Sequence, residues 1–187
     1  MKRRIVAITG GIGSGKSQVC TILRQLGYAT VDCDALSRQI ADDKEVIAAV
    51  EQLLGSECVT NGAINRPKVR EIVFSDENLL KQYNAIFHER VRQRLKAEVD
   101  KVDGSVFVEI AVLDAFDFHF DEIWLIESER QTRIDRVTQR DNVSSENVAH
   151  IMDRQHYPHC TKVIRNDGTL QQLEKQVISA LKCSQIV

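Results

Sequence analysis

The sequence predicts an α/β domain built on a central parallel sheet. Three observations carry this prediction: short apolar runs alternate with amphipathic stretches, the first apolar run ends at a cluster of glycines, and 187 residues suffice for one such core. Hydrophobic residues make up 43% of the chain and charged residues 28%, as in globular proteins. The formal net charge of -2 argues against a general affinity for nucleic acid.

The predicted core opens with a strand over residues 5–8, where four apolar residues in a row are typical of a parallel strand buried on both faces. From Lys16 to Leu26 apolar residues recur at helical spacing, and Gly27 then ends the helix. A second short strand is expected over residues 28–31, ending at Asp32. The chain therefore begins as a strand, loop, helix and strand.

Helices are expected next, over residues 35–40, 42–54 and 76–102 and from Asn65 onward, with a turn at Asn61-Gly62. The apolar stripe of the longest helix indicates core packing. Further strands are predicted over residues 106–108, 123–126 and 162–164, with Glu109 interrupting the first of these runs. Ser128 and Thr169 each precede a glutamine by three residues, so each is expected to open a helix with a capping box.

The glycine cluster, Gly10 to Ser17, reads G-G-I-G-S-G-K-S and satisfies the phosphate-binding pattern G-x-x-x-x-G-K-[ST]. Glycines let backbone N–H groups curl round phosphate, and the following helix offers its positive N-terminal end. Lys16 can neutralise the β and γ phosphates of a nucleotide, and the Ser17 hydroxyl can ligate Mg²⁺. The predicted nucleotide contacts from this loop are Gly11, Ile12, Gly13, Ser14, Gly15, Lys16, Ser17 and Gln18.

A loop of this kind predicts the P-loop NTPase fold, a three-layer sandwich around a parallel sheet, which GTPases, motor ATPases and small-molecule kinases share. The guanine-reading tetrad N-K-x-D is absent from the sequence, which favours ATP. The chain is also short for the accessory domains of an oligomeric motor. A small-molecule kinase is therefore favoured, by elimination.

Two acids, Asp32 and Asp34, follow the second predicted strand, at the edge where doubly wound sheets bind ligands. One carboxylate can position or deprotonate an acceptor hydroxyl, while the other orders Mg²⁺ through water or holds a cation. Arg38, four residues beyond Asp34, can pair with it or bind substrate phosphate. Solvated charges at a helix start are the alternative interpretation.

With these residues in place, the sequence resembles the dephospho-coenzyme A kinase family, whose members phosphorylate the ribose 3′-hydroxyl in the last step of coenzyme A synthesis. The resemblance extends over most of the chain. It rests on T-G-G-I-G-S-G-K-S at 9–17, D-x-D-x-x-x-R at 32–38, Arg140-Asp141, Gln155 and V-I-R-N-D-G at 163–168.

On the acceptor side, the resemblance implies that Asp34 is the base near the ribose 3′-hydroxyl, with Asp32 beside it and Arg38 contacting substrate. His88 stands where the family has a histidine followed by proline, and is expected to bind substrate; packing within a long helix is the alternative. Here Glu89 replaces that proline.

On the nucleotide side, the resemblance implies that Arg140 is a lid arginine that approaches ATP, and that Asn166 and Gly168 belong to a loop near the adenine. Physically, Arg140 could neutralise charge on the transferring phosphoryl group. An exposed ion pair with Asp141 is the alternative interpretation.

Two further segments depart from the family pattern. The family's P-L-L segment, often followed by an acid, is A-V-L-D-A at 111–115, where Asp114 is a candidate substitute for that acid. Between Gln155 and Val163 the chain is shorter than the pattern, leaving Lys162 and Arg165 as the basic residues nearby.

The expected organisation is a single P-loop kinase domain, residues 1–187, whose core comprises 1–40, 104–128 and 161–187, with a helical substrate-binding insert at 41–103 and a lid at 129–160. The expected reaction is Mg²⁺-dependent transfer of the ATP γ-phosphoryl group to dephospho-coenzyme A. The alternatives are a kinase for another small hydroxyl or nucleotide acceptor, and a non-catalytic nucleotide- or coenzyme-binding module.

The expected location is the cytoplasm, without membrane attachment. The five cysteines show no paired spacing, which favours reduced thiols. The apolar run after the basic N-terminal residues is too short for a signal peptide. The sequence makes no prediction of oligomeric state.

Overall fold

The computed structural model describes residues 3–113, 117–155 and 159–186. These residues divide into two compact units. The first, here called the core unit, holds the described residues of 1–32, 99–113 and 119–187. The second, here called the helical unit, holds those of 33–98 and 114–118.

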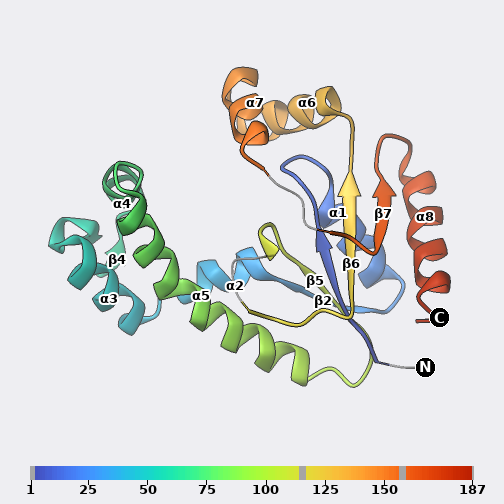
Figure 1. Ribbon diagram of the computed structural model, residues 1–187, viewed down its shortest axis with the longest axis horizontal. Coiled ribbons are helices and arrows are strands. Elements are labelled where there is room, and N and C mark those ends of the chain that lie inside the picture. Colours follow the sequence, from blue (N-terminus) through green and yellow to red (C-terminus); the bar gives the residue numbers. More distant parts are fainter. Residues whose placement is uncertain (1–2, 114–116, 156–158, 187) are drawn as a thin grey trace. The chain divides into compact units, whose positions relative to one another are not determined.

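The core unit contains a five-stranded sheet with the order β2-β5-β1-β6-β7, and every neighbouring pair is parallel (Figure 1). The predicted parallel sheet is therefore confirmed. Its central strand, β1, is buried on both faces, as its four apolar residues predict. The strands are β1 (Ile5–Thr9), β2 (Ala29–Asp32), β5 (Val106–Glu109), β6 (Glu122–Glu127) and β7 (Lys162–Arg165).

The helices of the core unit are α1 (Lys16–Gln25), α6 (Arg130–Asp141), α7 (Ser145–Asp153) and α8 (Leu170–Cys183). Apolar residues of α1 and α8 pack with residues of the strands in one hydrophobic cluster. Within it the rings of Phe107 and Trp124 lie 5.3 Å apart. Helices α6 and α7 form a pair beyond the carboxyl end of β6 (Figure 1), and their apolar residues form a separate cluster.

The two predicted capping boxes have different outcomes. Thr169 caps α8 as expected, and the box with Gln172 is complete. The prediction for Ser128 is wrong, because α6 begins at Arg130, and its N-cap residue, Glu129, makes no capping hydrogen bond through its side chain. The Ser128 hydroxyl instead donates to the carbonyl oxygens of Ser14, at 3.2 Å, and Asn166, at 2.8 Å. The Ser128 hydroxyl thus bonds to backbone carbonyls distant in sequence and does not cap the helix.

The helical unit buries its own apolar cluster between its helices. Asn65 caps the fourth helix by accepting from the N–H of Lys68, as the Asn-Arg-Pro sequence predicts. The turn at Asn61-Gly62 joins two short strands that the sequence pattern did not predict, because two residues each are too few to show alternation. Its elements are α2 (Cys33–Ile40), α3 (Lys44–Leu54), η1 (Ser56–Cys58), β3 (Val59–Thr60), β4 (Ala63–Ile64), α4 (Arg66–Val73) and α5 (Glu77–Asp100), the last of which ends in the core unit.

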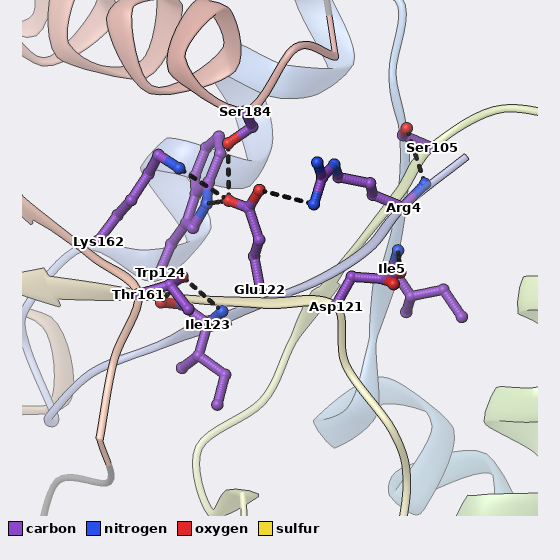
Figure 2. Close-up of polar contacts among 10 residues, drawn as sticks. All are labelled: Arg4, Ile5, Ser105, Asp121, Glu122, Ile123, Trp124, Thr161, Lys162 and Ser184. Atoms are coloured by element: carbon purple, nitrogen blue, oxygen red, sulfur yellow. Dashed lines mark hydrogen bonds and ion pairs between the residues drawn. The ribbon is translucent and has the colours of Figure 1, made fainter. Parts of the chain in front are cut away.

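The amino-terminal ends of the central strands are held by side chains of the core unit itself (Figure 2). The buried carboxylate of Glu122 accepts from Ser184 Oγ at 2.6 Å, Trp124 Nε1 at 2.9 Å and Lys162 Nζ at 2.9 Å, and pairs with Arg4 at 3.3 Å. Burial alone would raise its pKa, but these hydrogen bonds and the charge of Lys162 outweigh burial, and the pKa lies below the usual glutamate value. Glu122 therefore joins the starts of β6 and β7 to the residues just before β1 and just after α8.

Backbone N–H groups at this edge are also satisfied by side chains (Figure 2). Asp121 accepts from the N–H of Ile5 at 2.7 Å, and Thr161 accepts from that of Ile123 at 3.0 Å. Ser105 does the same for Arg4 at 3.1 Å. Within the described residues, no helix has the length and apolar character needed to cross a membrane.

Candidate functional site

The phosphate-binding motif forms a tight loop between β1 and α1, as predicted. Gly13 and Gly15 have φ values of 75° and 94°, which favour glycine. A Cβ atom at Gly13 would lie 2.6 Å from the Arg133 carbonyl oxygen, and one at Gly15 would overlap the Asn166 amide nitrogen. Both glycines are required by conformation and by close packing.

Side-chain donors hold the carbonyl oxygens of this loop. Arg133 Nε donates to the carbonyl of Ile12 at 2.9 Å, and Arg136 Nη1 donates to that of Gly13 at 3.3 Å. Asn166 Nδ2 donates to the carbonyl of Ser14 at 2.9 Å, beside the Ser128 hydroxyl. Neither Arg133 nor Arg136 was predicted from the sequence to contact this loop, and Ser128 was predicted only to cap a helix; the available signal was two arginines three positions apart on the predicted lid helix.

The N–H groups of Gly13, Gly15 and Ser17 make no hydrogen bond to any residue that the structure describes. In a planar trans peptide the C=O and N–H groups point to opposite sides. The donors on the carbonyls of Ile12 and Ser14 therefore orient the N–H groups of Gly13 and Gly15 away from those donors. Three N–H groups at the start of a helix form a site suited to an anion.

The side chains of the loop add charge and hydroxyl groups to this site. Lys16 is half-buried, and its ammonium donates to the carbonyl oxygen of Gly10 at 2.8 Å. Ser17 is exposed in the first turn of α1. The hydroxyl of Ser14, only 1% exposed, has no hydrogen-bond partner among the described residues.

Two carboxylates end neighbouring strands at the same edge of the sheet. Asp32 at the end of β2 is in register with Glu109 at the end of β5, and Glu109 is in register with Ile8. From its sequence context, Glu109 was interpreted only as an interruption of an apolar run, although an acid that ends a buried strand was the available signal. Burial, with Glu109 as its hydrogen-bond partner, raises the pKa of the Cys20 thiol, which therefore stays protonated.

The loop after β7 adjoins the phosphate loop. Asn166 is buried, and its amide nitrogen also donates to Gln18 Oε1 at 2.9 Å, so two of the predicted nucleotide contacts meet here. Gly168 is exposed and lines a surface pocket of about 560 Å³ together with Glu129, Arg165, Asp167, Gln172, Lys175 and Gln176.

Arg140 forms an exposed ion pair with Asp141, which was predicted from the sequence as the alternative to a nucleotide contact. Its guanidinium donates through Nε and Nη2 to both oxygens of Asp141, at 2.7 and 2.6 Å, and its side chain is 64% exposed. These hydrogen bonds lower the pKa of Asp141. The proposed approach of Arg140 to a nucleotide stays a prediction.

The remaining basic residues near the lid lie at opposite edges of the sheet. Arg165, at the carboxyl end of β7, lines the pocket beside Gly168. Lys162, at the amino end of β7, binds Glu122. The buried carboxylate of Glu122 thus holds the Lys162 ammonium at the edge of the sheet opposite the phosphate loop.

The predicted acceptor-side residues belong to the helical unit. Asp34 is exposed in the first turn of α2, and Arg38 follows one turn later. His88 is half-buried on α5, and burial lowers its pKa, so its imidazole is neutral at physiological pH. Helix α5 continues through Glu89, which pairs with Arg92 at 2.7 Å. Asp114 lies outside the described residues.

Comparisons with known proteins agree with the resemblance seen in the sequence. A family model described as dephospho-CoA kinase matches residues 4–172. The chain belongs to the dephospho-CoA kinase family. A Streptococcus thermophilus protein named dephospho-CoA kinase is 32% identical over 95% of this chain and 96% of its own length. A Thermus thermophilus protein of the same name is 33% identical over 95% of this chain and 90% of its own.

Solved structures agree with the fold. A crystal structure from Thermus thermophilus matches with a TM-score of 0.86 at 31% identity, covering 98% of each chain. A dephospho-CoA kinase from Campylobacter jejuni, at 20% identity, matches with a TM-score of 0.61 over 98% of this chain and 97% of that one. A shikimate kinase from Bacteroides thetaiotaomicron, at 14% identity, matches with 0.56 over 98% of each. The last two support the P-loop kinase fold alone.

Proposed function

We propose that this member of the dephospho-CoA kinase family transfers the γ-phosphoryl group of ATP to the ribose 3′-hydroxyl of dephospho-coenzyme A, giving coenzyme A and ADP. The observation that carries the proposal is the phosphate loop, which lies within a family match over residues 4–172. Its N–H groups at Gly13, Gly15 and Ser17 have no partner among the described residues and are suited to an anion.

Asp34 is proposed as the general base. Its carboxylate accepts the proton of the 3′-hydroxyl as that oxygen bonds to the γ-phosphorus and the bond from phosphorus to the bridging oxygen of ADP breaks. Asp34 is exposed in the first turn of a helix, where the helix dipole favours a negative charge. Asp32, Arg38 and the neutral His88 are proposed to hold the acceptor.

On the nucleotide side, Lys16 is proposed to neutralise the β and γ phosphates, and Arg140 the charge that develops on the transferring group. Arg140 would exchange Asp141 for phosphate, which an exposed ion pair allows at small cost. Gln18, Asn166 and Gly168 are proposed as contacts to the rest of the nucleotide.

The residues present fit a Mg²⁺ ion held jointly with ATP. Mg²⁺ keeps several waters and takes one or two protein oxygens together with substrate phosphates. No cluster of three or more His, Cys, Asp or Glu side chains that could hold a metal by itself occurs among the described residues. The Ser17 hydroxyl, with the carboxylates of Asp32 and Glu109, would supply such a site. When bound, the ion would neutralise phosphate charge.

We propose that residues 41–103 bind the acceptor and residues 129–160 form a lid. A pocket of about 230 Å³ in the helical unit supports the first role, because Arg90 and Arg94 line it and arginine suits the diphosphate of the acceptor. A cytoplasmic location is proposed because none of the five cysteines forms a disulfide.

The test is ADP formation, measured with and without dephospho-coenzyme A and Mg²⁺, with the position of the new phosphate identified by phosphorus NMR. ADP formation should require both additions. The Asp34→Asn variant should lose about 10²-fold or more in turnover, because the amide cannot take the proton. Asp42→Asn, at an exposed acid just beyond α2, is the matched control. Acceptor-independent ADP formation, or full activity of Asp34→Asn, would contradict the proposal.

A second candidate, a kinase for another small acceptor, is favoured by one observation. Helix α5 runs unbroken through Glu89, where the family pattern has a proline that would interrupt its hydrogen bonding. A panel of nucleosides and other small alcohols separates the two candidates. ADP formation with another acceptor and none with dephospho-coenzyme A would favour the second.

A further inference from the structure

Ile12 of the phosphate loop makes three contacts with residues of the proposed lid. Its N–H donates to Gln155 Oε1 at 3.0 Å, and its carbonyl accepts from Arg133 Nε at 2.9 Å. Its side chain packs against the apolar cluster that α6 and α7 form between them. One loop residue is thus part of the lid's own core.

The two polar side chains that hold Ile12 also hold each other. Arg133 Nη2 donates to the same Gln155 oxygen at 3.0 Å, which closes a ring of three hydrogen bonds with the Ile12 backbone. Arg133 is only 9% exposed. A buried guanidinium that loses its acceptors is costly, so the ring has one favoured arrangement.

The next loop residue, Gly13, lies against the same helix. A Cβ atom there would come within 2.6 Å of the Arg133 carbonyl oxygen and 2.9 Å of a Val137 methyl group. The Gly13 carbonyl accepts from Arg136. The base of α6 and the phosphate loop are therefore in contact over two consecutive loop residues.

The hydrogen bond from Arg133 to the Ile12 carbonyl also orients the N–H of Gly13. The carbonyl of Ile12 and the N–H of Gly13 belong to one peptide plane and point to opposite sides. When Arg133 fixes the carbonyl, it fixes the direction of an N–H that has no partner among the described residues. Gln155 fixes the guanidinium that does so.

We infer that Arg133 and Gln155 are positioning residues for the phosphates of ATP, acting through the peptide plane between Ile12 and Gly13. The inference rests on the proposed function, in which that N–H binds phosphate. It makes the base of the lid a permanent part of the phosphate site, so any closure of the lid takes place beyond this ring.

The first test is Arg133→Lys, which keeps the positive charge but cannot donate to Ile12 and Gln155 in the geometry of the guanidinium fork. Calorimetric Kd values for ATP and for inorganic tripolyphosphate should both rise about tenfold, as expected for one misdirected hydrogen bond. In turnover, kcat/KM for ATP should fall by a similar factor, while the KM for dephospho-coenzyme A stays unchanged.

Gln155→Met is the second variant, close in length but without the acceptor oxygen. It should produce the same pattern, and it carries the test if Arg133→Lys does not fold. In the double variant the two effects should be less than multiplicative, because both act through one peptide plane. The matched controls are Arg130→Lys, on the same helix and paired with Asp153, and Gln131→Met, bonded to Asp135. Both controls should bind ATP like the parent.

The outcomes distinguish the inference from the function on which it rests. If the parent protein binds ATP and both variants bind ATP and tripolyphosphate equally well, the positioning role is overturned and the proposed function stands. If the variants only lose stability, with unchanged Kd per folded molecule, the ring is structural and the inference is again wrong. If the parent binds neither ligand, the proposed function fails, and the inference fails with it.

Discussion

The two edges of the central sheet satisfy their backbone polar groups in opposite ways. At the amino edge, side-chain oxygens of Asp121, Thr161 and Ser105 accept from strand N–H groups (Figure 2). At the carboxyl edge, side-chain donors bind loop carbonyls. The N–H of Ile12 has Gln155 as its partner, but those of Gly13, Gly15 and Ser17 have none among the described residues. Side chains thus satisfy backbone N–H groups at the first edge, whereas at the second edge they satisfy carbonyl oxygens, and the N–H groups are suited to an anion.

Charged residues follow the same division. Glu122 at the amino edge is surrounded by donors and cations of the protein itself. At the carboxyl edge, the acceptors of Lys16 include the carbonyl oxygens of Gly10 and Gly11, which a phosphate can replace. A buried carboxylate surrounded by donors of the protein therefore indicates a role in stability. A loop whose carbonyl oxygens accept from side chains, with its N–H groups facing away, indicates a role in binding. Changes at one edge should leave the property of the other unaltered.

The largest expected effect is that of Lys16→Ala. Loss of the cation beside the transferring phosphate should lower kcat/KM by about 10³-fold, while the free energy of unfolding changes by about 0.5 kcal/mol or less. Steady-state kinetics and urea unfolding measure the two quantities. Lys182→Ala, at an exposed lysine of α8, is the control. Normal turnover of a folded Lys16→Ala protein would refute the role of the loop.

Glu122→Gln tests the other edge. The amide presents an N–H₂ group toward the cations and donors that the carboxylate satisfied, and the free energy of unfolding should fall by about 3 kcal/mol. The Kd for ATP, measured well below the new midpoint, should not change. Glu174→Gln, at an exposed position of α8, should leave both quantities unaltered. A weakened ATP affinity in Glu122→Gln would break the division between the edges.

The pH dependence of stability should come partly from the same carboxylate. Its pKa is lower in the folded protein than its ordinary value of 4.5, so its contribution is fully present above that value and is lost as the pH falls through the folded pKa. The difference in unfolding free energy between the parent and Glu122→Gln should therefore shrink as the pH falls from about 6 to about 3. A difference that stays constant over this range would contradict the assignment.

The smallest expected effect is that of Asp121→Ala, which removes the acceptor for the N–H of Ile5 at an exposed position. The free energy of unfolding should fall by about 1 kcal/mol, the usual value of one hydrogen bond, and ATP affinity should be unchanged. Asp103→Ala, at an exposed acid before β5, is the comparison variant. A weaker ATP affinity in Asp121→Ala would contradict the prediction that changes at the amino edge do not alter binding at the phosphate loop.

Much of the carboxyl edge could be predicted from the sequence, because its pattern is local. Residues 10–17 are contiguous, and the strand before them and the helix after them have clear periodicities. The Thr169 cap is equally local. The Ser128 cap was predicted wrongly by the same rule, since carbonyls of Ser14 and Asn166 compete for its hydroxyl. Local rules fail where a distant partner is better placed.

Other features of the site could not be predicted, because they depend on pairs far apart in the chain. Arg133 and Ile12 are 121 positions apart, and Asn166 and Ser14 are 152 apart. The sequence marks Lys162 only as a basic residue near the lid segment, whereas the register of β7 places it at the amino edge of the sheet, beside Glu122. Which end of a strand a residue occupies is decided by the sheet, not by its neighbours in sequence.

The sequence by itself determined the parallel sheet, the phosphate loop and the resemblance to a kinase family, because hydrophobic periodicity and a contiguous glycine motif are properties of short segments. Only the tertiary structure decided how the loop of Gly10 to Ser17 is oriented. Its N–H groups are directed by donors on the opposite side of each peptide plane, and those donors come from α6 and from the loop after β7. Folding alone brings those segments together at the loop.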